Sequence, residues 1–230
     1  MWRRISLKRT FPPGAVEGSL YNNVTEEIYP GDVGISVLAC YREKVFIEWK
    51  PKRGGFVAVH PETTPLRDQV VMKKDDPTDP NSKERPTLPS GNILAETDQH
   101  YVLITQPNGA FEPAVVSMSS TALKSSRLWN TLVNRVTETN AQGKIFSPAR
   151  WYVRYVLKTK GRVKDQYSWA TWNIEPAGKL DLTKTQDIGL YSAAKALHNA
   201  VKGGKIQVKQ EEQTDGAPTA DHVDDAPLDV

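Results

Sequence analysis

Cysteine is almost absent from this sequence, which has a single one, Cys40, among its 230 residues. An intramolecular disulfide is therefore excluded, and the four scattered histidines lack the close spacing of a zinc site. No apolar run reaches the 18 or so residues that a membrane-spanning helix needs, and no signal-peptide core is present. We therefore expect a soluble protein of a reducing cytoplasm.

Familiar catalytic and nucleotide-binding motifs are also missing. The sequence has no phosphate-binding glycine loop, no HExxH, no CxxC and no GxSxG elbow. The acidic group Asp75, Asp76 and Asp79 lies among prolines and lacks the spaced Gly and Glu of a calcium loop. His60 and His100 have no acid or nucleophile at a telling spacing. We expect a non-enzymatic protein without metal or cofactor. An enzyme whose carboxylates lie far apart in the sequence is the alternative.

Charge is present in quantity but divided unevenly along the chain. Residues 210–230 contain seven acids and no Lys or Arg, whereas residues 1–209 contain 30 basic and 20 acidic residues. A body of about +10 joined to a tail of −7 is typical of proteins that bind nucleic acid or another polyanion. A tail that only aids solubility is the plainer reading.

Apolar periodicity predicts several antiparallel strands and two helices. The runs 33–41 and 44–50 indicate a hairpin or one long bent strand, 53–59 indicates a further strand, and 100–105 with 113–118 indicates a hairpin around Asn108-Gly109. An amphipathic stripe from Leu123 to Val136 predicts one helix, and the stripe Leu190, Ala194, Leu197 and Val201 predicts another over 187–202.

The order of these elements favours a mainly β (α+β) fold. One helix set before the last two strands is the connectivity of an OB-fold, a small Greek-key barrel, with a curved α+β sheet as the alternative. We expect an N-terminal arm over 1–30, one binding domain over 31–204 with a polar loop at 72–90, and a disordered acidic tail over 205–230.

Residues 150–172 mix cations and aromatic rings more densely than the rest of the chain. They contain six basic side chains, one acid and six aromatics. In a strand, Trp151, Val153, Tyr155 and Leu157 share one face, which we expect to be core, while Tyr152, Arg154, Val156 and Lys158 share the other, which suits an exposed groove. The alternation in 167–172 leaves open which face of that strand is exposed.

This mixture is the chemistry that single-stranded nucleic acid requires. Cationic grooves follow the phosphates, and exposed aromatic rings stack on the bases. The same mixture of cations and aromatic rings recurs over residues 41–56, in and after the first predicted hairpin. We therefore predict that three or four of the aromatics touch a ligand, within a binding set of Arg42, Lys44, Trp49, Lys50, Lys52, Arg53, Tyr152, Arg154, Lys158, Lys160, Arg162, Lys164 and Trp172.

Several stretches resemble one family. "FIEWKPKRGG" followed by "FVAVHP", then "PAVVSMSSTALKSSRLWNTLV", "WYVRY" and "YSWATW" are similar to single-stranded DNA-binding proteins of tailed bacteriophages, over residues 30 to 200. The resemblance implies a role in replication and recombination. The acidic tail is similar to tails that dock on partner enzymes and compete with DNA for the groove, although those usually end in an aromatic residue and this one ends "DDAPLDV".

The leading hypothesis is therefore a sequence-tolerant single-stranded DNA-binding protein without enzymatic activity. Its partners would be single-stranded DNA and, through the tail, phage or host replication and recombination enzymes, with no membrane partner. A nucleic-acid-modifying enzyme or its subunit, of nuclease type, is the second hypothesis, and a virion or assembly protein without a nucleic-acid role is the third. The sequence leaves open the oligomeric state, the site size and the preference between DNA and RNA.

Overall fold

The computed structural model describes residues 3–7, 15–22, 25–51, 54–74, 78, 82–164 and 167–206. Side chains are described for all of these except 3–7, 163, 164, 167 and 168. The chain divides into two compact units, one comprising Met1–Glu43 and Gln99–Val208 and the other Lys44–Asp98 and Lys209–Val230.

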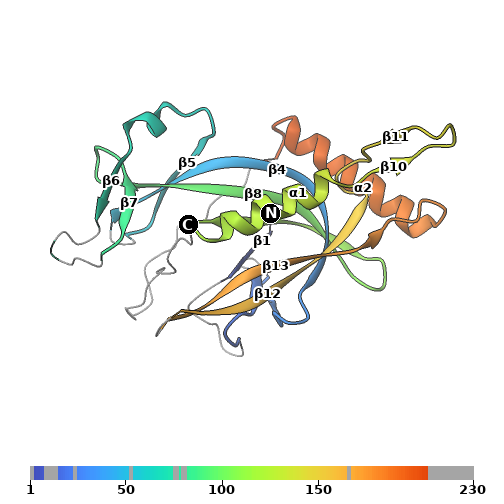
Figure 1. Cartoon of the computed structure of the whole chain (residues 1–230), viewed down its shortest axis with the longest axis horizontal. Coiled ribbons are helices and arrows are strands. Elements are labelled where there is room, and N and C mark those ends of the chain that lie inside the picture. Colours follow the sequence, from blue (N-terminus) through green and yellow to red (C-terminus); the bar gives the residue numbers. More distant parts are fainter. Residues whose placement is uncertain are drawn as a thin grey trace. The chain divides into compact units, whose positions relative to one another are not determined.

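The first unit is built on an open sheet (Figure 1). Its strands are ordered β13 (Tyr167–Lys179), β12 (Val153–Lys164), β4 (Ile35–Trp49), β8 (Ile93–Thr105), β9 (Phe111–Ser119), β1 (Arg3–Leu7), β2 (Leu20–Asn22) and β3 (Ile28–Tyr29). Strand β1 pairs parallel with β9 and antiparallel with β2. Over the described residues this path does not return on itself, so β13 and β3 lie at its two ends.

Two helices cover opposite faces of the central strands. Trp129 and Val133 of α1 (Ala122–Asn134) pack in one core cluster with Val37, Val102 and Val116. Leu190, Ala194, Leu197 and Val201 of α2 (Thr185–Lys202) pack in a second cluster with Leu38, Cys40, Leu103 and Val115. Successive residues of a strand point to opposite faces, so β4, β8 and β9 must be apolar on both. This explains the uninterrupted apolar run "VLAC" in β4.

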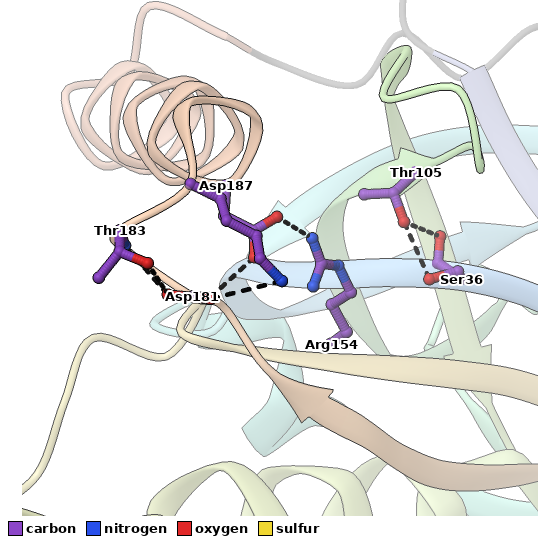
Figure 2. Close-up of polar contacts among 7 residues, drawn as sticks. Ser36, Thr105, Arg154, Asp181, Thr183 and Asp187 are labelled. Atoms are coloured by element: carbon purple, nitrogen blue, oxygen red, sulfur yellow. Dashed lines mark hydrogen bonds and ion pairs between the residues drawn. The ribbon is translucent and has the colours of Figure 1, made fainter.

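Polar contacts hold the start of α2 against β12 (Figure 2). Asp187, in the first turn of α2, forms an ion pair with Arg154 of β12 and accepts a hydrogen bond from the Asp181 backbone N–H at 2.7 Å. Burial alone would raise the pKa of Asp187, but the hydrogen bonds from Arg154 and from the Asp181 backbone bring that pKa below its ordinary value. Nearby, the Thr105 and Ser36 hydroxyls are 2.9 Å apart and join β8 to β4.

The second unit contains the distal parts of β4 and β8 with three further strands. β5 (Phe56–Pro61) pairs with β4, and β6 (Val71–Lys74) pairs with β7 (Glu84–Thr87), which also pairs with β8. A short 3-10 helix, η2 (Pro65–Gln69), lies between β5 and β6. Phe46, Leu88 and Leu94 form the core of this unit. In the first unit, β10 (Glu138–Thr139) and β11 (Ile145–Phe146) form a separate two-stranded sheet.

The mainly β (α+β) class is confirmed, and so are both helices and the hairpin at Asn108-Gly109. The turn there closes with the Gln106 N–H donating to Ala110 O at 2.9 Å, and Gly109 has a φ of +84°. The closed OB-like barrel is wrong, because the strand path stays open and helices cover both faces of its centre. The alternative, a curved α+β sheet, agrees with the α+β sheet found, which is not closed.

Other segments also differ from expectation. Of the two alternatives for residues 33–50, the single long strand is the one found, as β4 over Ile35–Trp49, and the hairpin is not. The polar loop expected over 72–90 includes most of β6 and all of β7, and the described part of the arm 1–30 supplies three strands to the sheet. The domain boundaries stay predictions. Beyond Ile206 the predicted acidic tail lies outside the described residues.

Candidate nucleic-acid interface

The hairpin of β12 and β13 continues beyond the strand that supports it. Its two strands pair from Val153 and Lys179 out to Lys164 and Tyr167, whereas β4 pairs with β12 only over Arg154–Leu157. From Lys158 outward, the hairpin is therefore a two-stranded ribbon with no third strand paired to it in the described part of the chain. We call this part the outer hairpin, residues 158–164 and 167–173; Figure 1 shows its strands running side by side.

The register of the hairpin determines which side chains share a face. Lys158 pairs with Asn173, Lys160 with Thr171 and Arg162 with Trp169. Directly opposite residues of an antiparallel pair project to the same face. The cations of β12 therefore share one face with Trp169, and we call Lys158, Lys160, Arg162 and Trp169 the basic face.

The prediction that Trp172 is an exposed stacking residue is wrong. Trp172 pairs with Thr159, on the opposite face from the cations, and its side chain is 5% exposed within the core cluster of α1. Trp169, which was not predicted, is partly exposed. The length of the connection between the two strands is what places Trp169 with the cations. Because β12 ends at Lys164 and β13 begins at Tyr167, even-numbered residues of β12 lie opposite odd-numbered residues of β13.

The cations of the basic face differ in their partners. The Lys158 amine is 2.9 Å from a Glu175 carboxylate oxygen, and this hydrogen bond and charge lower the pKa of Glu175. Such a surface pair is weak and leaves Lys158 able to exchange its partner for a phosphate. Lys160 and Arg162 are exposed and have no ion pair with any described residue. Lys164 ends β12, and its side chain lies outside the described set.

Two predicted residues at the base of the hairpin have structural contacts instead. Arg154 is committed to the ion pair with Asp187 and is 24% exposed. Tyr152 is partly buried and packs against both core clusters of the first unit. The expected burial of Trp151, Val153, Tyr155 and Leu157 is confirmed, but they do not share one face. Trp151 precedes β12 and packs in the second core cluster, whereas the other three pack in the first.

A loop from the N-terminal part of the chain supports the outer hairpin at Thr159. The Thr159 N–H donates to Gly31 O at 2.8 Å, and its hydroxyl donates to Gly18 O at 2.7 Å. A Cβ on Gly31 would lie 2.1 Å from both Gly18 O and the Thr159 hydroxyl. Only glycine fits this position, because the two loop segments and the strand meet there.

The other predicted cations are divided between the two units. In the second unit Lys44 is 2.9 Å from Glu96, Lys50 is exposed, and Trp49 is in edge contact with Phe56. Lys52 and Arg53 lie outside the described residues. Arg42 belongs to the first unit, where it is partly buried. The burial of His100, and then the charges of Arg150 and Arg42, depress the pKa of that histidine.

Two histidines have partners that sequence spacing did not reveal. In the second unit His60 Nε2 is 2.8 Å from Glu48, whose other oxygen accepts from Asn92 Nδ2 at 2.6 Å. His60 lies opposite Phe46, so it is the diagonal cross-strand neighbour of Glu48. In the first unit His100 Nε2 is 2.7 Å from the Ser126 hydroxyl. Neither partner stands at a telling spacing in the sequence, so only the tertiary structure brings them to the histidines.

Other features of the described residues bear on the classes of function. Cys40 is fully buried, and burial raises the pKa of its thiol to about 12, as expected of a packing residue. No three His, Cys, Asp or Glu side chains of the described ranges gather as a metal site would require. Neither helix has the length and apolarity to cross a bilayer, as far as the structure is described.

Comparison with known proteins assigns a family. Comparisons with curated proteins and with solved structures gave no match. A family model described as Pam3 phage gp34-like protein matches residues 8–207, which include the stretches that resemble phage proteins. The phage part of that resemblance is thereby confirmed, and the chain belongs to the Pam3 phage gp34-like protein family.

Proposed function

We propose that this phage protein binds single-stranded DNA during replication or recombination, without enzymatic activity and with little sequence preference. The outer hairpin is its binding arm in the first unit. It acts in the host cytoplasm, and its acidic tail docks on phage or host enzymes or competes for the basic face.

The observation that carries this proposal is the register of the hairpin. It gathers Lys158, Lys160 and Arg162 on one face with a partly exposed Trp169. Alternate residues of a strand lie on one face about 7 Å apart, so the three cations form an evenly spaced row along which the phosphates of a single strand can lie. A cation row of this pitch beside an aromatic ring matches the backbone and bases of a single strand.

A fluorescence titration tests the proposal. Addition of a thymidine oligomer to the full chain should quench tryptophan emission, with no turnover of the strand. The double variant Lys160→Ala/Arg162→Ala should bind more weakly, whereas Lys144→Ala/Lys195→Ala, which removes two exposed cations outside the hairpin and outside the predicted binding set, serves as the control. Absence of binding at low salt would overturn the proposal and leave a virion or assembly role.

Salt dependence measures the number of phosphates that the hairpin contacts. Log affinity should fall linearly with log salt, by about 0.7 per neutralised phosphate of a single strand. Removal of Lys160 and Arg162 should therefore flatten that slope by about 1.4, because these two exposed cations have no competing partner among the described residues. An unchanged slope and affinity would place the site elsewhere.

The His60–Glu48 pair favours a second candidate, hydrolysis of nucleic acid. A histidine oriented by a carboxylate, itself held by Asn92, has the arrangement of a general base. Cleavage of single-stranded DNA that is lost in His60→Ala would support this candidate. Cleavage that persists unchanged in the variant would exclude His60 as its base.

A further inference from the structure

Arg150 is a partly buried cation without a counter-ion among the described residues. It lies in the turn before β12, where the Tyr152 N–H donates to Ala149 O at 2.9 Å. Its Nε is buried and has no hydrogen-bond partner, and no described residue forms an ion pair with its guanidinium. A guanidinium that is removed from water needs an anion or other acceptors to offset the lost hydration.

A second guanidinium lies beside Arg150. The antiparallel register of β12 on β4 pairs Arg154 with Leu38, and the same register continued toward the start of β12 brings position 150 level with Arg42. Burial, and then the charge of Arg42, lowers the pKa of Arg150, so the two cations repel each other. Like charges that are held close together destabilise the folded state unless an anion lies between them.

Two fully buried rings near these arginines also have unpartnered nitrogens. His100 and Trp129 are 1% and 0% exposed and stack beneath α1, with ring centroids 4.5 Å apart. The His100 Nδ1 and the Trp129 Nε1 have no hydrogen-bond partner. Burial, and then the charges of Arg150 and Arg42, lower the pKa of His100, so its ring lies within reach of both cations. The cluster is therefore rich in N–H donors and positive charge and lacks an acceptor.

We propose that this cluster, Arg42, Arg150 and His100, is a binding site for a phosphate group. Guanidinium groups bind phosphate oxygens through paired N–H donors, and both arginines are partly exposed, so the ligand can approach them from solvent. His100 adds a donor at Nδ1 in the tautomer whose Nε2 accepts from the Ser126 hydroxyl, 2.7 Å away. The site lies outside the outer hairpin and does not depend on the proposed single-strand binding.

Thermal unfolding of the full chain with pyrophosphate tests the site. Pyrophosphate should raise the unfolding midpoint by several degrees relative to sodium chloride of equal ionic strength, because a ligand of the native state stabilises that state. Arg150→Met, which keeps the apolar stem without the charge, should bind pyrophosphate about tenfold more weakly or worse. Arg127→Ala, which removes an exposed arginine of α1, is the matched control and should keep the full response. An equal rise with sodium chloride, or an unaltered rise in Arg150→Met, would overturn the site.

The stability of Arg150→Met without phosphate separates a binding role from a structural one. The variant should be at least as stable as the unaltered protein, because it removes one of two repelling charges and keeps the packing of the stem. A midpoint several degrees lower would assign Arg150 to the support of the fold and overturn the proposal.

A phosphate of a DNA strand and a free phosphate or nucleotide offer this site the same chemistry, and oligomer titrations distinguish them. If the site takes a strand phosphate, Arg150→Met should flatten the salt slope of thymidine-oligomer binding by about 0.7. If it takes a free phosphate or nucleotide, that slope should not change while pyrophosphate still stabilises the protein. Lys160→Ala/Arg162→Ala should keep the response to pyrophosphate, so the loss of strand binding would overturn the proposed function and not this site.

Discussion

Trp169 and Trp172 are three positions apart on β13, yet they meet opposite environments. Trp169 is partly exposed beside Arg162, whereas Trp172 is 5% exposed and accepts a hydrogen bond at its backbone carbonyl from Ser125 of α1. Because an odd spacing in a strand moves a side chain to the other face, one ring serves the surface and the other the core.

Alanine substitutions at the two rings should therefore affect different properties, DNA binding for one and stability for the other. Trp169→Ala should weaken binding of single strands by about 1–3 kcal/mol with little loss of stability. Trp172→Ala should lower the free energy of unfolding by about 3–5 kcal/mol, the usual cost of removing a large buried aromatic side chain. Denaturant unfolding and oligomer titration measure the two quantities. A Trp169 variant that unfolds would assign that ring to the core.

His100 is a buried base beneath α1. Its side chain is 1% exposed, its ring stacks on Trp129 with centroids 4.5 Å apart, and its Nε2 is 2.7 Å from Ser126. Burial, and then the charges of Arg150 and Arg42, hold its pKa well below the ordinary value of 6.5. The folded protein therefore keeps this imidazole neutral.

Stability should decrease on acidification because of His100. Below pH 6.5 the unfolded chain protonates this histidine and the folded chain does not, so protons favour unfolding. The free energy of unfolding should fall by up to about 1.4 kcal/mol per pH unit from this group, until its folded pKa is reached. Denaturant unfolding of the protein and of His100→Gln at several pH values measures the difference. Identical pH slopes would show that His100 is not the responsible group.

At the scale of elements, the hairpin depends on the loop that supports it. The Thr159 hydroxyl reaches Gly18 O across 141 positions of sequence, and Gly31 occupies a space without room for a methyl group. No third strand among the described residues pairs with the outer hairpin, so this contact limits its movement relative to the sheet. A binding arm needs such support to hold its cations in a constant arrangement.

The same Gly-to-Ala change should have opposite consequences at two positions. Gly31→Ala should destabilise the protein by about 1–3 kcal/mol, because a Cβ there meets two oxygens at 2.1 Å. Gly189→Ala, at an exposed position of α2 where an added Cβ has nothing within 4 Å, should stabilise it by roughly 1 kcal/mol. Thermal or denaturant unfolding compares them. Equal free energies of unfolding for the two variants would mean that the loop accommodates a methyl group at position 31 without loss of stability.

At the scale of the whole molecule, the separation of charge along the sequence is the main feature. Residues 1–209 carry 30 basic and 20 acidic side chains, and residues 210–230 carry seven acids. A tethered acidic segment is present at high effective concentration near any cationic site that it can reach. We therefore expect the tail to compete with DNA.

Deletion of residues 210–230 should raise affinity for single strands. The gain should be largest at low salt and should shrink as salt rises, because screening weakens the attraction of the tail for the basic face. The unfolding free energy should not change, since the tail composition offers little to a core. Titrations of both proteins over a salt series test this. Equal affinities of the two proteins at low salt would mean that the tail does not compete with DNA, and that it serves solubility or binds another partner.

Local patterns in the sequence were sufficient for the class and the elements. The stripe Leu190, Ala194, Leu197 and Val201 predicts the buried face of α2, and alternation from Val153 to Leu157 predicts the inner face of β12, because both periods are properties of a single element. The division of charge between residues 1–209 and 210–230 can also be read from the sequence, since counting charged residues requires no knowledge of the fold.

Tertiary structure alone decided the sheet and the face that serves as the candidate site. Apolar residues on both faces of β4 are compatible with a barrel or with an open sheet between helices, and only the docking of α1 and α2 distinguishes them. Likewise, the pairing between β12 and β13 puts Trp169, and not Trp172, on the face of the cations. The ion pair with Asp187 of α2 holds Arg154 at the base of the hairpin. Such contacts join distant residues, and a one-residue change in pairing would exchange the two faces of the strand.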